Sequence, residues 1–140
     1  GETGLYTRAG AGAREIGYWI DVTCTGKGYA TEAAAAMVKV GFEIDRVSRI
    51  EIHCAVPNTA SARVPIKLGF RQETTLSRRI VATDDTVHDL AIWTMFLDDY
   101  PGSPASRLRV SAFDCAGRLL PSRGRRRTGC PRRLRGRAAP

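Results

Sequence analysis

The stretch from Tyr18 to Ala33 reads YWIDVTCTGKGYATEA, and its character changes twice along its length. An apolar, extended segment passes through two glycines and enters an alanine-rich helix. Because glycine has no Cβ, the chain can turn tightly while the N–H groups of Gly26 to Ala30 converge. Those N–H groups have no partner within the helix, and an anion placed there also meets the positive end of the helix dipole. The stretch predicts a strand, a phosphate-binding loop and a helix.

Two common phosphate-binding loops do not fit this stretch. The Walker loop requires GxxxxGK followed by Ser or Thr, whereas Lys27 lies between the glycines and is followed by Gly28. The dinucleotide-binding pattern GxGxxG fails because its last position is Thr31, and no acidic residue follows a second strand at the expected distance.

The loop resembles the acyl-coenzyme-A loop of the GNAT superfamily of N-acetyltransferases, whose pattern is Gln or Arg, two residues, Gly, one residue, Gly or Ala. Thr25, Gly28 and Ala30 occupy the three pattern positions. Thr25 departs from the usual Gln or Arg, which puts one side-chain contact in doubt and leaves the main-chain cradle. A second stretch, NTASARVPIKLGF over residues 58–70, resembles the N-x-x-S helix and K-x-G-F ending of the branch that contains ribosomal-protein alanine N-acetyltransferases.

The periodicity of the first 120 residues predicts the order strand, strand, helix, strand, helix, strand, strand. The expected strands are Glu2–Arg8, Arg14–Asp21, Arg49–Ala55, Phe70–Ser77 and His88–Leu97, and the expected helices cover residues 30–44 and begin again at Asn58. In the first helix the recurrence of Ala33, Met37, Val40 and Ile44 predicts an apolar core face. Gly41 lies within this helix and costs about 1 kcal/mol relative to alanine.

The resemblance implies an α/β (α+β) fold of the acyl-CoA N-acyltransferase type, a mixed and mostly antiparallel sheet flanked by helices. The sheet is expected to splay between the strands Arg14–Asp21 and Arg49–Ala55. The family's first strands and first two helices, which wall the acceptor site, have no counterpart here. Residues 1–120 are therefore interpreted as a partial GNAT domain, incomplete at its N-terminus. The exposed edge at the first strand favours a homodimer or aggregation.

The same resemblance implies acetyl-CoA as the cofactor, with its pantetheine arm in the splay. The residues expected to bind it lie at the end of the strand, in the loop and at the second helix: Ile20, Asp21, Val22, Gly26, Lys27, Gly28, Tyr29, Ala30, Thr31, Asn58 and Ser61. Asn58 is also a candidate N-cap for the Ser61 N–H.

Three residues are candidates for catalysis. The family position of Ser61 implies a hydroxyl near the thioester, where it could protonate the leaving thiolate or steady the tetrahedral intermediate. Many family members place a tyrosine where this chain has Pro65, so the usual general acid is absent, and Pro65 also predicts a kink or bulge. A base must deprotonate the amine, and Glu15 and Asp89 are the candidates, although each is more often a surface or turn carboxylate.

The two histidines are weaker candidates. His53 alternates with apolar residues in a strand and is interpreted as a structural or edge residue. His88 adjoins Asp89 and is a candidate for contact with the acceptor.

Composition limits the remaining possibilities. With 140 residues and 43% apolar content, the chain forms one domain at most. No apolar run is long enough for a membrane span, so we expect a soluble, cytoplasmic protein without a membrane partner. Cys24, Cys54, Cys115 and Cys130 show no CxxC spacing and no neighbouring histidine, so no metal site or redox pair is expected.

The net charge of +8 is concentrated in residues 121–140, which carry eight arginines and no acid, so residues 1–120 are neutral. This tail is expected to be disordered. It could bind nucleic acid non-specifically through phosphate neutralisation, or it is an accidental extension from GC-rich DNA, which is the interpretation we favour.

Three classes of function follow. The leading one is an acetyl-CoA-dependent N-acetyltransferase acting on a primary amine, either a protein N-terminus or a small amine such as an aminoglycoside. The second is a truncated, catalytically inactive CoA-binding remnant. The third is a nucleic-acid-associated protein that acts through its arginine-rich tail.

Overall fold

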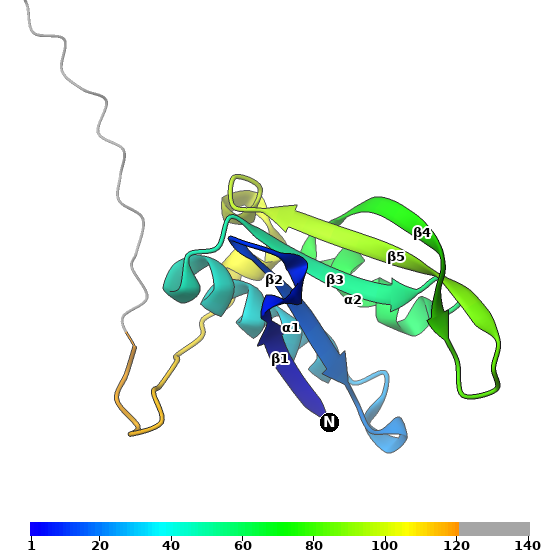
Figure 1. Cartoon of the computed structure of the whole chain (residues 1–140). Coiled ribbons are helices and arrows are strands. Elements are labelled where there is room, and N and C mark those ends of the chain that lie inside the picture. Colours follow the sequence, from blue (N-terminus) through cyan, green and yellow to red (C-terminus); the bar gives the residue numbers. More distant parts are fainter. Residues whose placement is uncertain (121–140) are drawn as a thin grey trace, which may run out of the picture.

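A five-stranded sheet forms the centre of the protein. The computed structural model describes residues 1–120, and the strands lie in the order β1-β2-β3-β5-β4 (Figure 1). Their bounds are Glu2–Tyr6 for β1, Ala13–Trp19 for β2, Arg49–Ala55 for β3, Arg71–Val81 for β4 and Val87–Phe96 for β5. Only β2 and β3 run parallel, and the other neighbours are antiparallel. The predicted element order and the mixed, mostly antiparallel sheet are therefore confirmed.

Two α-helices cover one face of this sheet. Helix α1 spans Tyr29–Lys39 and continues into a π-helical turn, η3, at Val40–Asp45, while α2 spans Thr59–Leu68. Short 3-10 turns lie at Thr7–Ala9 (η1), Val22–Cys24 (η2), Tyr100–Gly102 (η4) and Pro104–Arg107 (η5). Both helices lie behind the sheet in Figure 1, and their buried residues join one core cluster. Within residues 1–120, no α-helix packs on the opposite face.

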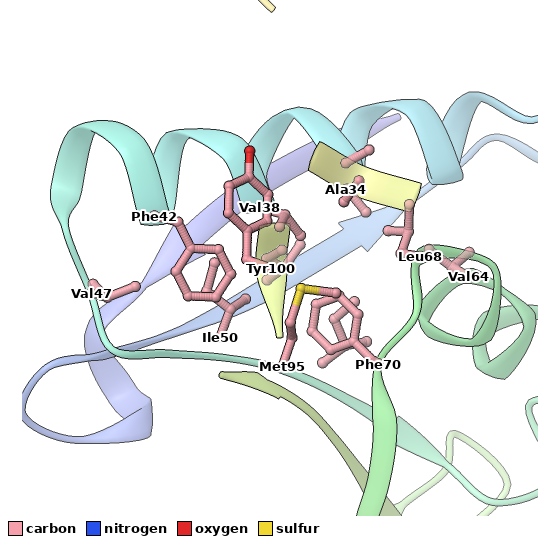
Figure 2. Close-up of a cluster of buried hydrophobic side chains, with 14 residues drawn as sticks. Ala34, Val38, Phe42, Val47, Ile50, Val64, Leu68, Phe70, Met95 and Tyr100 are labelled. Atoms are coloured by element: carbon pink, nitrogen blue, oxygen red, sulfur yellow. The ribbon is translucent and has the colours of Figure 1, made fainter. Parts of the chain in front are cut away.

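The core lies between the helices and the covered face of the sheet (Figure 2). Alternate residues of the three central strands point into it, among them Ile16, Ile50 and Met95, each at most 1% exposed. The segment after β5 closes one end, where the rings of Tyr100 and Phe42 lie 5.0 Å apart between centroids. Burial of these side chains is the main force that fixes α1 and α2 against the sheet.

The predicted apolar face of the first helix is wrong by one position. The buried residues are Ala34, Ala35 and Val38, followed by Gly41 and Phe42. An alanine-rich run gives little contrast between its faces, and the π-helical turn after Lys39 changes the rotation per residue. The four residues predicted to form the face, Ala33, Met37, Val40 and Ile44, are only partly buried.

From the sequence alone, Gly41 is expected to lower helix stability, but the packing of the helix against β3 favours glycine at this position. A Cβ at this position would lie 2.7 Å from Cδ1 of Ile50, closer than real Cβ contacts allow. Glycine therefore lets the end of the helix approach β3 directly.

The strand β4 is longer than its predicted range. It continues to Val81 through an irregularity between Leu76 and Ile80, where Arg78 has a φ of +55°. This bulge interrupts the alternation of side chains, and the exposed Arg78 and Arg79 within it hide the strand from a periodicity argument.

The predicted splay is present between β2 and β3. The two strands pair at only three positions, Ala13 with Arg49, Arg14 with Ile50 and Glu15 with Glu51. Beyond Glu15 and Glu51 they diverge, and each continues as a strand with no pairing across the gap (Figure 1). We call this divergence the fork.

Candidate functional site

The glycine loop leads from the end of β2 into α1. Asp21 Oδ1 accepts hydrogen bonds from the N–H of Thr23 at 2.9 Å and from its hydroxyl at 2.6 Å, which shapes the turn η2. These bonds, that of the hydroxyl first, lower the pKa of Asp21. Gly26 and Gly28 follow with φ of +77° and +89°, values that favour glycine, and Gly28 is the N-cap of α1.

The main-chain N–H groups of this loop are available to an anion. Among the hydrogen bonds of residues 1–120, none is donated by an N–H of Gly26 to Ala30, whereas the Gly28 carbonyl accepts from Glu32 at 3.0 Å. A Cβ at Gly26 or Gly28 would meet no atom within 4 Å, so the space around the loop is open. The backbone of the loop thus has the form expected of a phosphate cradle.

Three of the residues expected to bind the cofactor also line a cavity on the β1 side of β2. This cavity has a volume of about 350 Å³ and is formed by Gly1, Glu2, Thr3, Ile20, Asp21, Cys24, Tyr29 and Ala33. Ile20, at the end of β2, and Tyr29, at the start of α1, therefore line the same cavity.

Asn58 and Ser61 lie at the start of α2. The predicted N-cap is confirmed, because Asn58 Oδ1 accepts the N–H of Ser61 at 3.0 Å. Ser61 in turn contacts Tyr18 of β2: the Tyr18 hydroxyl donates to the Ser61 carbonyl at 3.0 Å and lies 3.1 Å from Ser61 Oγ. Burial raises the pKa of Tyr18 above its usual value, so the phenol keeps its proton at neutral pH.

Sequence reasoning missed Tyr18 as a site residue. It treated Tyr18 as one apolar position of an alternating strand, and the contact with Ser61 spans 43 residues of sequence. The signal that could have revealed it is Pro65, whose missing N–H leaves the Ser61 carbonyl without its helical donor.

The candidate base Glu15 lies at the apex of the fork, on the face opposite the helices. It is only 7% exposed, and Arg8 donates to both of its carboxylate oxygens at 2.6 and 2.7 Å. Nδ1 of His53 lies 3.5 Å from Glu15, and Nε2 of His53 lies 2.6 Å from Glu51, which also accepts from Arg49 at 2.7 Å. We call Arg8, Glu15, Arg49, Glu51 and His53 the charged cluster.

This cluster corrects the interpretation of Glu15 and decides between the two interpretations of His53. Glu15 is a buried carboxylate with both oxygens hydrogen-bonded to Arg8, rather than a surface one. His53 is a structural residue rather than an edge residue, because β3 lies between β2 and β5 in the centre of the sheet. Periodicity places Glu51 and His53 on one face of a strand, but only the register with β2 brings that face to Glu15.

The other acidic candidate, Asp89, lies apart from these groups. Its Oδ1 accepts the N–H of Arg78 at 2.8 Å and so supports the bulge of β4, while its carbonyl accepts from Val56 at 2.9 Å. No hydrogen bond or ion pair of the described residues joins Asp89 to Ser61 or Glu15. His88 is half-buried at the same hairpin, with Nε2 at 3.0 Å from the Thr86 hydroxyl.

Several sequence predictions concern other properties of the chain. In the described residues, no group of three or more His, Cys, Asp or Glu side chains is arranged to hold a metal ion. Across residues 1–120, every helix is too short or too polar to cross a membrane. Cys24, Cys54 and Cys115 form no disulfide. The arginine-rich tail, its suggested nucleic-acid binding and Cys130 lie outside the described residues.

Comparison with known proteins agrees with this geometry. The chain is 29% identical over 84 residues to the ribosomal-protein-serine acetyltransferase of Escherichia coli (strain K12), covering 60% of this chain and 46% of that protein. Among solved structures, a GNAT-family acetyltransferase from Bacillus anthracis matches with a TM-score of 0.62 and 30% identity, covering 69% of this chain and 57% of that one. A ribosomal-protein-S5-alanine acetyltransferase from Vibrio fischeri matches with a TM-score of 0.59 and 25% identity, covering 64% and 48%.

The chain spans about half the length of the curated relatives it matches. The family model described as an acetyltransferase (GNAT) domain matches residues 1–71, which is half of the chain. The match includes β1, β2, the glycine loop, α1, β3 and α2, the elements that build the cradle and the fork. The chain therefore belongs to the GNAT acetyltransferase family, and its relatives include acetyltransferases of ribosomal proteins.

Proposed function

We propose that this protein binds acetyl-CoA and takes part in acetyl transfer to a primary amine. The observation that carries the proposal is the row of available N–H groups from Gly26 to Ala30, located where β2 leaves the fork. Main-chain donors and a helix N-terminus suit a pyrophosphate, and the open space at both glycines leaves room for it. Ile20, Asp21 and Val22 lie between this loop and the fork, and their main chain is proposed to bind the pantetheine arm of the cofactor.

The residues of the fork fit the chemistry of the transfer. Acetyl-CoA, when bound, supplies an activated thioester. The Ser61 hydroxyl is the group proposed to donate a proton to the leaving thiolate. Glu15, with His53 beside it, is the group proposed to take the amine proton, because it lies at the fork's apex on the uncovered face. Asp89 remains the second candidate base.

The acceptor proposed first is the N-terminal amine of a protein. Support comes from the relatives, whose names describe acetylation of ribosomal proteins on serine and on alanine. A small amine is the alternative acceptor.

A second candidate function is CoA binding without turnover. It is favoured by the uncovered face of the sheet, where the described residues supply no helix to hold an amine beside Glu15. Positioning of two reactants contributes about 7 to 11 kcal/mol to catalysis, so an acceptor that is not held reacts slowly.

Calorimetry with CoA tests the binding proposal. We expect Gly28→Val to weaken binding at least tenfold, because a β-branched residue resists the left-handed φ at position 28. Lys27→Ala is the matched control, and loss of one exposed charge should weaken binding less than about fivefold. Equal affinity of the wild type and Gly28→Val would contradict the cradle, provided that circular dichroism shows both chains folded.

A thiol-release assay with acetyl-CoA and N-terminal peptides separates the two candidate functions. Turnover that falls on Ser61→Ala would support the acetyltransferase. Binding of CoA with no release above the uncatalysed rate would support the binding remnant.

A further inference from the structure

The start of α2 contains an unusual hydrogen-bond arrangement around Ser61. In an α-helix the carbonyl of residue 61 accepts the N–H of residue 65, but Pro65 has no N–H to donate. The Tyr18 hydroxyl donates to this carbonyl instead, at 3.0 Å. A side chain of β2 thus replaces a main-chain bond inside α2.

The same phenol fixes the direction of the Ser61 hydroxyl. A phenol has one proton, and Tyr18 gives it to the carbonyl. The contact of 3.1 Å between Tyr18 Oη and Ser61 Oγ is therefore satisfied when Ser61 donates to Tyr18. With the Ser61 N–H bonded to Asn58, the N–H, the carbonyl and the hydroxyl of Ser61 all have defined partners.

This arrangement lies where the strands of the fork no longer pair. Tyr18 comes three residues after Glu15, the last residue of β2 paired with β3, and its ring packs against the core. Pro65 is fully buried on the other side of the contact. The Tyr18 and Ser61 hydroxyls thus join β2 directly to the first turn of α2.

We infer that Tyr18 is a positioning residue for Ser61: by accepting the Ser61 proton it leaves the lone pairs of Oγ to accept a hydrogen bond from the thiol of CoA in the fork. When the thiolate leaves, the Ser61 hydroxyl turns from Tyr18 to give it this proton. The inference rests on the proposed function. Tyr18 acts through Ser61 rather than as an acid itself, because its one proton is donated to the Ser61 carbonyl. Two roles are then combined in Tyr18: it satisfies the carbonyl, which is structural, and it orients Oγ, which serves the site.

The two roles can be separated with Pro65→Ala, which returns an N–H donor to position 65. In a Tyr18→Phe chain this second change should restore the melting temperature, because the Ser61 carbonyl regains a partner. It should not restore the orientation of Oγ. The readout for the orientation is the affinity for CoA relative to desulfo-CoA, which lacks the sulfur atom, measured by calorimetry at pH 7.

We expect the wild type to prefer CoA by about three- to tenfold, the effect of one hydrogen bond. The preference should disappear in Tyr18→Phe, in Ser61→Ala and in the Tyr18→Phe/Pro65→Ala chain, and should persist in Pro65→Ala alone. A preference that persists in the double variant would reduce Tyr18 to a structural role and overturn the inference. Wild-type binding of both ligands with equal affinity would overturn it while leaving the proposed function intact. Binding of neither ligand would refute the proposed function and this inference together.

Discussion

The two faces of the sheet close the fork with different chemistry. On the covered face, Tyr18 and Ser61 meet as uncharged hydroxyls above an apolar core. On the uncovered face, the charged cluster holds the apex with two carboxylates, two guanidinium groups and an imidazole. The covered face owes its stability to apolar burial, and the uncovered face owes its arrangement to ion pairs with partial access to water. Substitutions on the two faces should therefore differ in size and in their dependence on conditions.

The largest expected difference is between two isoleucines on opposite faces. Ile50 points into the core and is fully buried, whereas Ile92, opposite His53, points to the uncovered face and is half-buried. Ile50→Ala should lower the free energy of unfolding by about 2–5 kcal/mol. Ile92→Ala should lower it by less than half as much, measured by urea denaturation. Equal losses would show that the two faces are covered equally in solution.

A smaller effect is expected in the charged cluster. Arg8→Ala removes the guanidinium that binds both oxygens of the buried Glu15 and should lower the free energy of unfolding by about 1–3 kcal/mol. Arg8→Ala/Glu15→Gln should recover part of this loss, because the variant no longer buries an uncompensated charge. If Arg8→Ala alone leaves the urea midpoint unchanged, the pair contributes no stability.

The covered face should also respond to alkaline pH. Tyr100 donates to Glu43 at 2.7 Å, and burial first, then this bond, raise its pKa above the usual value. The unfolded chain therefore releases the phenol proton at lower pH than the folded chain. The free energy of unfolding should fall above about pH 10, by up to about 1.4 kcal/mol per pH unit from this group. In Tyr100→Phe the contribution of this phenol is absent, so the free energy of unfolding should fall less steeply with pH. Thermal denaturation measured from pH 8 to 11 would detect the difference.

The glycine loop should show a modest effect on stability. Gly28→Ala places a Cβ in the left-handed region, at a cost of about 1–2 kcal/mol. Gly102→Ala is a useful control, since an added Cβ there also meets no atom within 4 Å but φ is not positive. If Gly28→Ala and Gly102→Ala lowered the melting temperature equally, the effect at position 28 would not come from its left-handed backbone conformation.

The smallest effect concerns the thiols. Cys54 is buried on the covered face, and burial raises its pKa. Mass spectrometry after brief alkylation of the native protein should find Cys24 and Cys115 modified before Cys54. Early modification of Cys54 would indicate that the covered face opens readily.

These contrasts follow the division between what the sequence predicts and what it cannot. The loop at Gly26 and Gly28 and the N-cap at Asn58 are local, because each depends on residues a few positions apart, and both were predicted. The face of α1 was displaced by one position because its alanine-rich run gives little contrast between its faces. The partners of Glu15 and Ser61 come from other elements, and only the strand register and the packing of α2 bring them together. The order of strands and helices along the chain was predicted from periodicity, and the fork was predicted from the family resemblance.

The three-position pairing of β2 with β3 has a consequence for how the protein deforms. On one side lies the β1–β2 hairpin and on the other the β3–β5–β4 part of the sheet. Within residues 1–120 their backbones are joined by this short parallel ladder and, just before it, by the Ser48 N–H, which donates to the Gly12 carbonyl at 2.8 Å. The sheet thus consists of two parts that pair only at one end, and the packing of α1 and α2 on both parts sets the angle between them. Amide hydrogen exchange should report this construction, with slow exchange at Glu15 and Glu51 giving way to fast exchange at those amides that face the gap.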